Sequence, residues 1–307
     1  MMENIRQKRS FVFYTFLTGL LLAGALLIGI FLWWKWREHS RPDRVNMSKE
    51  LFRGVTYRLI AKDSPRNLLT HVVEIRTEQN AIREIVITPP DPSKGMEHVA
   101  RTTSDFAKSF DVDLATNGSY FSPFHSNSPF DFYPHPGDPV NVLSTAINNG
   151  KRYSGPEKTG NRNILYWHGK KLVIFLDAQV PDDIETAIPG GVQLLNKGKQ
   201  WEESPEHQPM YAPRTAIGWD RNQSHVWLVT VDGRQEGYSD GMQVKELADF
   251  MASLNAHDAL ALDGGGSSTL VVQTKGKFQI LNAPFHTRVP MRERPVPNHL
   301  CLRLEHR

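Results

Sequence analysis

The hydrophobic pattern of the chain opens with an uncharged apolar run over residues 11–34. A helix rises about 1.5 Å per residue, so this run is long enough to cross a hydrocarbon core of about 30 Å. Tryptophans and basic residues follow it, where a cleaved signal peptide would have small residues. We therefore predict one uncleaved transmembrane helix over residues 11–34, preceded by a short flank over residues 1–10.

Basic residues stand on both sides of the predicted span. The N-terminal side has Arg6, Lys8 and Arg9, and the C-terminal side has Lys35, Arg37, Arg41 and Arg44. The positive-inside rule needs an excess of Lys and Arg on one side. Charge alone therefore leaves two orientations open, with the rest of the chain either outside the cytoplasm or facing it.

Beyond the span, the polar stretch 35–50 predicts a tether, and the mixed pattern of residues 51–307 predicts a single domain. Period-two alternation and β-branched clusters predict strands within it. The expected strands cover residues 55–60, 70–75, 82–87, 113–116, 163–167, 171–176, 226–231, 259–262, 270–273 and 295–304. Apolar residues at three- and four-residue steps predict helices over 99–110 and 241–255. The expected class is α+β, with a mixed, largely antiparallel sheet core and flanking helices.

Residues 122–160 show no sustained hydrophobic period. They are rich in Pro, Asn, Gly, Ser and His. Loops of this length in compact domains are usually functional or disordered. We predict a long loop here, with His125 and His135 either in contact with a substrate or simply solvated.

Composition excludes several classes of function. The net charge is +3 and the Lys and Arg residues are scattered, so we expect no nucleic-acid partner. Cys301 is the only cysteine, which excludes an intrachain disulfide and a Cys-rich zinc site. The sequence has neither a His-Glu-x-x-His zinc motif nor a Gly-x-Ser-x-Gly serine-hydrolase motif. We expect no required cofactor, and a divalent cation near the aspartates stays an open alternative.

The strongest chemical signal follows the strand predicted at 259–262. It reads Asp263-Gly264-Gly265-Gly266-Ser267-Ser268. The strand delivers a carboxylate, and the glycines let the backbone approach a ligand closely. Successive amides in such a turn can form an anion nest to which the serine hydroxyls add donors, so phosphate fits. The alternative is a plain glycine-rich hairpin turn in which Asp263 accepts from backbone amides.

A second carboxylate, Asp232, ends the strand predicted at 226–231. Two acids at strand ends could face one cleft, as the paired carboxylates of glycoside hydrolases do. Arg214 and Arg234 could clamp a phosphate through two parallel hydrogen bonds, which a lysine forms less well. The alternatives are a simple turn at Asp232 and ordinary surface charges at the two arginines.

The segment Asn117-Gly118-Ser119-Tyr120-Phe121 follows another predicted strand. Asn117 could hydrogen-bond a sugar hydroxyl. The two aromatic residues could offer a face to a sugar ring, or they could fill the core.

These motifs, taken in order, resemble the phosphodiester glycosidase family. They are Asn117-Gly118-Ser119-Tyr120-Phe121, Arg214-Thr215-Ala216-Ile217-Gly218, Val231-Asp232-Gly233-Arg234, the helix after Gly241, and Leu262-Asp263-Gly264-Gly265-Gly266-Ser267. The run Glu293-Arg294-Pro295-Val296-Pro297-Asn298 is similar to the closing motif of the family. Ser119-Tyr120 stands where the family commonly has Gly-Phe, a difference that concerns the shape of the sugar pocket.

The resemblance implies a hydrolase that cleaves between an anomeric carbon and a phosphodiester, releasing a free sugar and a phosphomonoester. It implies that Asp263, Asp232 and Arg214 are catalytic, with neither carboxylate fixed as nucleophile or base. The expected substrate-binding residues are Asn117, Gly118, Ser119, Arg234, Gly264, Gly265, Gly266, Ser267 and Ser268.

The expected substrate is a glycosyl phosphodiester of envelope or exopolysaccharide metabolism, such as that of an N-acetylhexosamine. Members of this family act outside the cytoplasm. The resemblance therefore implies a single-pass protein of the inner or plasma membrane with an extracytoplasmic domain, periplasmic in a Gram-negative cell. Two alternatives remain, a non-catalytic cell-wall or sugar-phosphate binding module and a structural component of an envelope assembly.

Overall fold

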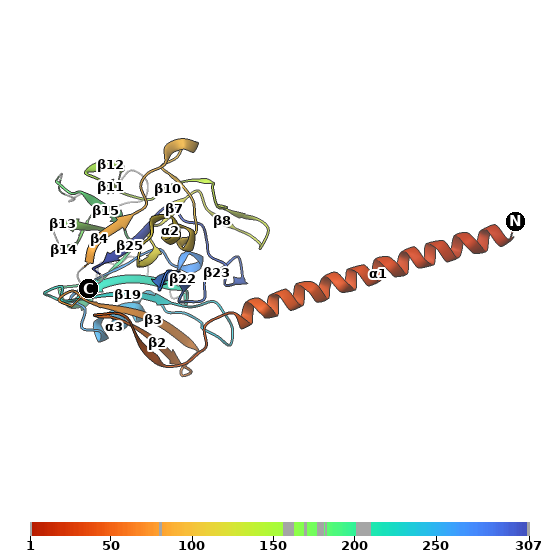
Figure 1. Cartoon of the computed structure of the whole chain (residues 1–307), viewed down its shortest axis with the longest axis horizontal. Coiled ribbons are helices and arrows are strands. Elements are labelled where there is room, and N and C mark those ends of the chain that lie inside the picture. Colours follow the sequence, from red (N-terminus) through yellow and green to blue (C-terminus); the bar gives the residue numbers. More distant parts are fainter. Residues whose placement is uncertain are drawn as a thin grey trace. The chain divides into compact units, whose positions relative to one another are not determined.

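The computed structural model describes residues 2–79, 82–155, 163–168, 171–176, 181, 183–200 and 210–305. The chain divides into two compact units, Met1–Arg41 and Pro42–Arg307. The first unit is the helix α1 (Met2–His39), drawn in red in Figure 1. Its segment Tyr14–His39 is long and apolar enough to be a candidate membrane span, with a hydropathy of 2.3. The apolar N-terminal helix predicted from the sequence is therefore present.

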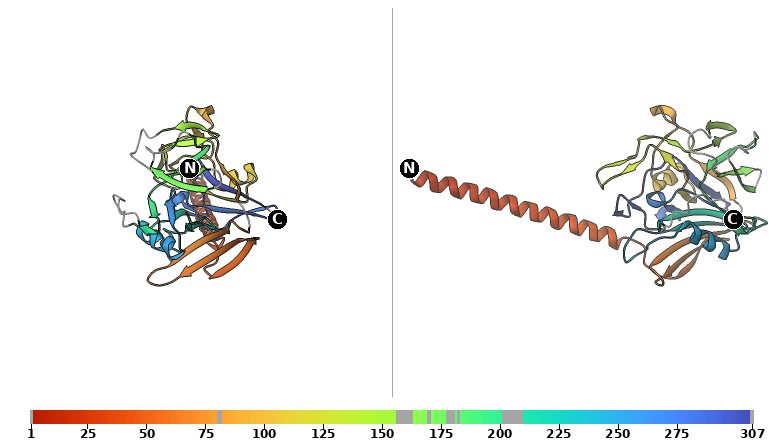
Figure 2. Two further views of the ribbon diagram at one scale, coloured as in Figure 1. Left: turned by 90° about the vertical axis from the view of Figure 1, so that its left-hand side faces the viewer. Right: turned by 180° about the vertical axis from the view of Figure 1, so that it is seen from behind.

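The largest sheet of the second unit has eight strands. In spatial order they are β1 (Met47–Phe52), β2 (Val55–Lys62), β3 (Leu68–Arg76), β19 (His225–Val231), β18 (Arg214–Trp219), β20 (Asp258–Ala261), β16 (Gln193–Asn196) and β17 (Lys199–Gln200). The N-terminal strands β2 and β3, orange-brown in Figure 2, lie at the lower side of the domain in both views.

Two five-stranded sheets complete the framework. One is ordered β22 (Lys277–Ile280), β21 (Leu270–Thr274), β6 (Leu114–Asn117), β25 (His299–Leu304) and β4 (Ile82–Ile87). The other is ordered β12 (Lys151–Ser154), β11 (Ala146–Asn148), β15 (Thr186–Pro189), β13 (Asn163–His168) and β14 (Lys171–Leu176). Neighbouring strands in all three large sheets run antiparallel in the described part of the chain, which confirms the largely antiparallel α+β class.

Short strands lie in three smaller sheets. They are β5 (His98–Val99), β10 (Pro139–Val142) and β7 (Phe121–Ser122) in one, β8 (His125–Ser126) and β9 (Phe132–Tyr133) in the second, and β23 (Phe285–His286) and β24 (Val289–Pro290) in the third. The segment 122–155, predicted as a loop, thus contains several of these short strands as well as β11 and β12. Residues 156–160 of that prediction lie outside the described residues.

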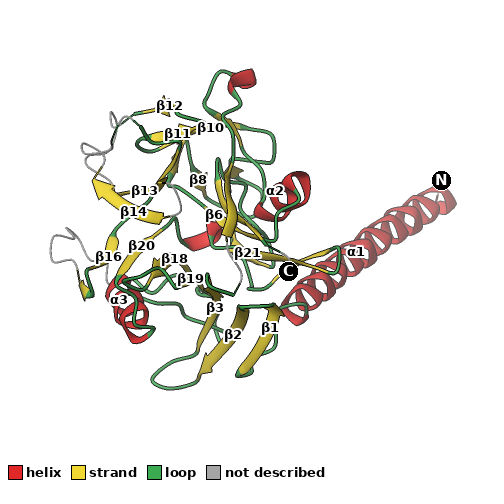
Figure 3. Ribbon diagram, turned by 60° about the vertical axis from the view of Figure 1, so that its left-hand side comes forward, coloured by secondary structure: helices red, strands yellow, loops and turns green. Residues whose placement is uncertain are grey.

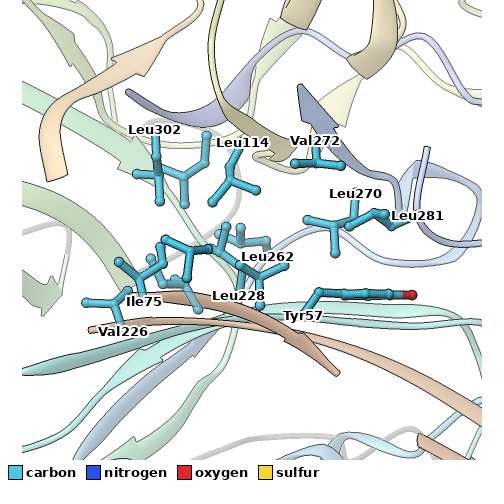
Figure 4. Packing of buried hydrophobic residues seen from close by; sticks show 14 of the residues in the cluster. Tyr57, Ile75, Leu114, Val226, Leu228, Leu262, Leu270, Val272, Leu281 and Leu302 are labelled. Carbon is cyan, nitrogen blue, oxygen red and sulfur yellow. The ribbon is translucent and has the colours of Figure 1, made fainter. Parts of the chain in front are cut away.

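The eight-stranded sheet and the sheet containing β6 pack face to face. Leu114, Leu270 and Leu302 point from the second sheet toward Ile75 and Leu228 of the first, as Figure 4 shows. Each fully buried leucine contributes about 2 kcal/mol through removal of apolar surface from water. This shared core fixes the two sheets as adjacent layers.

Helices cover the outer faces of these two sheets (Figure 3). Helix α2 (Thr103–Phe110) packs Phe106 against Ala115 and Val271, the strand positions that alternate with the core leucines. Helix α3 (Val244–Ser253) packs Leu247 and Met251 on the other sheet. The layers are therefore helix, sheet, sheet and helix. Both helices begin later than predicted, and Thr102 caps α2 by accepting from the amide of Asp105 at 3.2 Å.

Besides the short strands, several other elements differ from the sequence-based expectations. Strand β18 was not expected, because its buried residues show no alternation. Helix α1 continues to His39 and strand β1 begins at Met47, so both overlap the stretch 35–50 that polarity assigned to a tether; an exposed edge strand has the same polar composition. Strand β25 begins at His299, after the prolines that were included in the expected strand 295–304.

Candidate active site

The glycine run connects the two central layers of the domain. It leaves β20 in the eight-stranded sheet, forms the short 3₁₀ helix η3 (Gly265–Ser267) and enters β21 in the opposite sheet. Leu262 before the run and Leu270 after it both lie in the shared core (Figure 4). Because the flanking strands belong to different sheets, the run is a crossing between layers, which excludes the alternative of a hairpin turn.

All three glycines are favoured by the local geometry, and at Gly264 a Cβ atom would lie 2.8 Å from the Pro213 carbonyl oxygen. Gly265 has a φ of +63°, in the left-handed region that favours glycine. At Gly266 a Cβ atom would lie 2.9 Å from Nη2 of Arg294 and 3.0 Å from Nδ1 of His286. The run therefore lets the Arg294 and His286 side chains approach its backbone closely.

The amides of the run are mostly occupied by protein acceptors. Gly264 donates to Oδ1 of Asp263 at 2.9 Å, and Gly265 donates to the carbonyl of Pro213 at 2.8 Å. The amides of Ser267 and Ser268 close the 3₁₀ turn onto glycine carbonyls. Most of the amides that were predicted to form a phosphate-binding nest therefore already donate to protein oxygens. The buried hydroxyl of Ser268 has no hydrogen-bond partner in the described structure.

Asp263 is held in one position by its neighbours. Its Oδ2 atom accepts from the Ser267 hydroxyl at 2.6 Å and lies 3.8 Å from Nη1 of Arg294. Its backbone amide donates to the Gly118 carbonyl at 2.9 Å, and its carbonyl accepts from the Asn117 side chain at 2.7 Å. The carboxylate is therefore fixed beside a cation, with its side chain 10% exposed.

Arg294 contributes a guanidinium that was not assigned from the sequence. Its Nη1 atom donates to Ser267 at 3.0 Å, its Nε atom lies 3.4 Å from Nδ1 of His286, and it stacks on the Phe124 ring at 4.3 Å. Burial lowers the pKa of Arg294, and the Asp263 carboxylate offsets part of that effect. Its position in the closing motif Glu293–Asn298 could have identified Arg294 as a site residue. It was missed because a sequence does not distinguish a buried arginine from a surface one.

The rest of that closing motif anchors the segment. Glu293 accepts from the Ser104 amide at 2.9 Å, at the start of α2. Burial raises the pKa of Glu293. Asn298 accepts from the Ser119 amide at 2.8 Å and donates to its hydroxyl at 2.9 Å. Arg294 therefore lies between two anchored residues, Glu293 and Asn298.

The segment Asn117–Ser119 supports the site from within the protein. Asn117 is fully buried, donates to Asp263 and accepts from the Thr215 hydroxyl at 2.9 Å. Ser119 is also fully buried, and Gly118 has no room for a Cβ atom beside Asn298. The expectation of a sugar contact by Asn117 is therefore replaced by a role in positioning Asp263.

Arg234 and Arg214 lie beside the glycine run, since a Cβ atom on Gly265 would be 3.1 Å from Nη1 of Arg234 and one on Gly264 would be 3.8 Å from Cδ of Arg214. Burial lowers the pKa of Arg234 and the charge of Asp263 acts in the opposite direction. Burial also lowers the pKa of Arg214, and the positive charge of Arg234 lowers it further. Arg214 donates to the carbonyls of Met242 and Met210, at 2.9 Å each, which fixes its orientation.

Asp232 does not face a cleft. Its side chain is 0% exposed, and its Oδ2 atom lies 2.9 Å from Nε2 of His71. Its Oδ1 atom accepts from the Ala283 amide at 2.9 Å and from the Asn282 side chain at 3.2 Å. The expectation that two carboxylates share one cleft is corrected, because every face of Asp232 is enclosed by protein. His71, which the sequence did not single out, also contacts Tyr57 at 2.8 Å.

A cavity of about 400 Å³ adjoins these residues. Arg234, Arg288, Arg294 and Phe124 line it, together with residues 126–129 of the β8–β9 hairpin. The charged residues of this lining are three arginines with no carboxylate. The cavity is therefore suited to an anion such as a phosphate. In the described part of the chain, no three His, Cys, Asp or Glu side chains cluster so that they could hold a metal ion.

Comparisons with known proteins identify the family and the fold of the chain. The sequence profile of the phosphodiester glycosidase family matches residues 110–303. A search of curated proteins gave no match.

Among solved structures, the chain is similar to the catalytic domain of zebrafish N-acetylglucosamine-1-phosphodiester alpha-N-acetylglucosaminidase, auto-inhibited by its pro-peptide. The identity is 21%, the TM-score is 0.59, and the match covers 87% of this chain and 92% of that one. A Burkholderia pseudomallei protein described as exported matches at 14% identity with a TM-score of 0.53, over 81% and 76% of the two chains. These likenesses show the fold, and the family profile over most of the domain shows that the chain belongs to the phosphodiester glycosidase family.

Proposed function

We propose that this domain hydrolyses glycosyl-1-phosphodiesters between the anomeric carbon and the phosphodiester oxygen. Water supplies the new hydroxyl of the free sugar, and the phosphomonoester leaves. The observation that carries the proposal is the Asp263 carboxylate, fixed 3.8 Å from Arg294 next to a cavity lined by arginines. Membership of the family supports a hydrolase of this kind.

The arginines fit the chemistry of the leaving group. A phosphomonoester leaves as a stable anion, so it needs less protonation than an alcohol does. Stabilisation of the developing negative charge then matters more, and fixed cations provide it without reorganisation. Arg234 and Arg294 both line the cavity and are the groups we assign to the phosphate.

Asp263 is the less enclosed of the two carboxylates, with a side chain 10% exposed against 0% for Asp232, and it is the one we assign to the reacting sugar. An anomeric carbon that loses its leaving group gains positive charge, which an adjacent carboxylate stabilises. The enclosed position of Asp232 assigns to it a supporting role. The Asp263 carboxylate thus acts as nucleophile or as base toward water, and we leave these two roles open.

We propose that the domain acts outside the cytoplasm, on envelope or exopolysaccharide phosphodiesters. The candidate span Tyr14–His39 supports anchoring in the inner or plasma membrane. The similar Burkholderia protein is described as exported, which favours the same side for this domain. A periplasmic reporter fused after Arg307 tests this placement, and reporter activity only in the cytoplasm contradicts it.

The test of the reaction is hydrolysis of a panel of glycosyl-1-phosphodiesters in ¹⁸O-labelled water, with and without a chelator. The proposal expects the label in the released sugar, because the anomeric C–O bond breaks. Label in the phosphate contradicts the assigned bond. Binding of these substrates without turnover favours the alternative of a non-catalytic binding module, and the chelator arm tests whether a divalent cation takes part.

A further inference from the structure

The segment Pro42–Arg44, which follows the apolar helix in the sequence, is bound tightly to the domain. Arg44 donates through Nη1 to the Tyr238 carbonyl and through Nη2 to the Lys62 carbonyl, the latter at 2.9 Å. It also pairs with Asp63. Its side chain is 18% exposed, although the sequence suggested a solvated charge in a tether. This part of the expected tether is therefore an ordered piece of the domain.

Tyr238 completes the attachment from the domain side. Its hydroxyl donates to the Pro42 carbonyl at 2.8 Å, and its ring lies in the main hydrophobic core with 6% of the residue exposed. Tyr238 lies in the loop between β19 and α3, so it links the segment Pro42–Arg44 to that loop. Tyr238 bonds to this segment through its backbone carbonyl and through its hydroxyl, and its ring is packed in the core. These contacts restrain the loop.

The loop that contains Tyr238 also carries Arg234, one of the arginines of the candidate site. The Arg234 amide donates to the Asp240 carbonyl at 3.1 Å, and the Gln235 amide donates to the Ser239 carbonyl at 3.0 Å. Arg234 itself has a φ of +59°, which is unfavourable for a residue with a side chain. Such a conformation persists only where surrounding contacts hold it.

We propose that Arg44 and Tyr238 are positioning residues for Arg234. The segment that joins the membrane helix to the domain then forms part of the support of the phosphate-binding arginine. This inference rests on the proposed function of Arg234. It implies that loss of the Arg44 contacts weakens substrate binding while the chemistry at Asp263 continues.

The test uses the full-length protein in detergent micelles with the variants Arg44→Ala and Tyr238→Phe. The second variant keeps the ring in the core and removes only the bond to Pro42. We expect KM to rise about three- to tenfold, the scale of one or two lost hydrogen bonds, with kcat nearly unchanged. Arg53→Ala, in the exposed β1–β2 turn, is the matched control and should leave KM unchanged.

A double-mutant cycle separates positioning from a general structural effect. If Arg44 acts through Arg234, Arg44→Ala raises KM in the wild type and has no further effect in an Arg234→Ala background. The same increase in both backgrounds, or no increase in either, overturns the inference.

A second readout keeps this inference distinct from the proposed reaction. Hydrogen exchange at the amides of residues 235–240 should become faster in Arg44→Ala and stay unchanged in Arg53→Ala. Unchanged exchange in Arg44→Ala contradicts the positioning role whatever the activity. A wild-type protein that cleaves no glycosyl-1-phosphodiester contradicts the proposed function, and the exchange measurement still decides whether Arg44 restrains the loop.

Discussion

Nη1 of Arg294 lies 3.8 Å from Oδ2 of Asp263, and the hydroxyl of Ser267 connects the two by accepting from the arginine and donating to the carboxylate. Each of the two charged side chains is 10% exposed. Removing one member of such a pair leaves the other as a poorly solvated charge. Asp263 and Arg294 therefore form one preorganised unit.

Arg294→Lys should reduce kcat/KM by about 10- to 100-fold, because an ammonium cannot reproduce a planar guanidinium that bonds to Ser267 and stacks on Phe124. Steady-state kinetics with a glycosyl-1-phosphodiester provide the measurement. Arg303 of β25 pairs with Glu84 of β4 outside the candidate site, so Arg303→Lys is the control and should retain full activity. Wild-type kinetics for Arg294→Lys would contradict a catalytic role of the Arg294 guanidinium.

Gly266→Ala should lower activity more than stability. The new Cβ would meet Nη2 of Arg294 at 2.9 Å, and a flexible side chain can yield where backbone cannot. We expect at least about a tenfold loss of kcat/KM from the displaced arginine, with little change in Tm. Gly276→Ala is the converse control, since it has a φ of +72° with no atom within 4 Å. Gly276→Ala should lower Tm and keep activity. A Gly266→Ala variant that lowers Tm but keeps full activity would contradict the proposed effect of the close approach at Gly266.

Asp232→Asn should act mainly on stability. The carboxylate is enclosed by His71, Asn282 and the Ala283 amide, so the change weakens charge-assisted hydrogen bonds by about 1–3 kcal/mol. Denaturant unfolding measures this loss, and Asp249→Asn on the exposed side of α3 is the control. If Asp232→Asn has wild-type stability and no turnover, Asp232 is a catalytic residue after all and the supporting role is wrong.

Acid should destabilise the fold through its buried histidines. Burial lowers the pKa of His299 to about 3, against about 6.5 in an unfolded chain. Between these values the unfolded state binds a proton that the folded state does not, so stability is complete above about pH 6.5 and falls as the pH falls. At pH 5 the loss from one such histidine is about 2 kcal/mol.

The measurement is urea unfolding at pH 7 and pH 5 of the wild type and His299→Gln. The variant should lose about 2 kcal/mol less between the two pH values, because it has no group to titrate at this position. His125→Gln, whose side chain is 48% exposed in the native protein, should keep the acid sensitivity of the wild type. Equal losses in the wild type and His299→Gln would contradict the linkage.

The sequence predicted the elements whose patterns are local. The apolar helix, the strand before Asp263 and the family motifs all follow from neighbouring residues. The layer arrangement depends on longer-range pairing, since β20 and β21 flank one glycine run yet belong to different sheets. Nothing in the run itself distinguishes that crossing from a hairpin.

Burial of polar residues was the harder part of the site to predict. Asp232 at a strand end looks available in the sequence, but His71, Asn282 and the Ala283 amide, all distant in the sequence, enclose it. Arg294 looks like a surface charge until Ser267 and Phe124 are seen beside it. The identity of a buried polar residue's partner is a tertiary property, so local pattern carries no signal for it.

The most direct test of the central claim is turnover of a glycosyl-1-phosphodiester by Asp263→Asn. Asparagine keeps the size and the hydrogen-bond acceptor for Ser267 but removes the charge, so binding of the phosphate should persist while sugar release falls by at least about a thousandfold. Calorimetric binding and sugar release measured on the same sample separate these two effects. Sugar release at the wild-type rate by Asp263→Asn would contradict a site centred on this carboxylate.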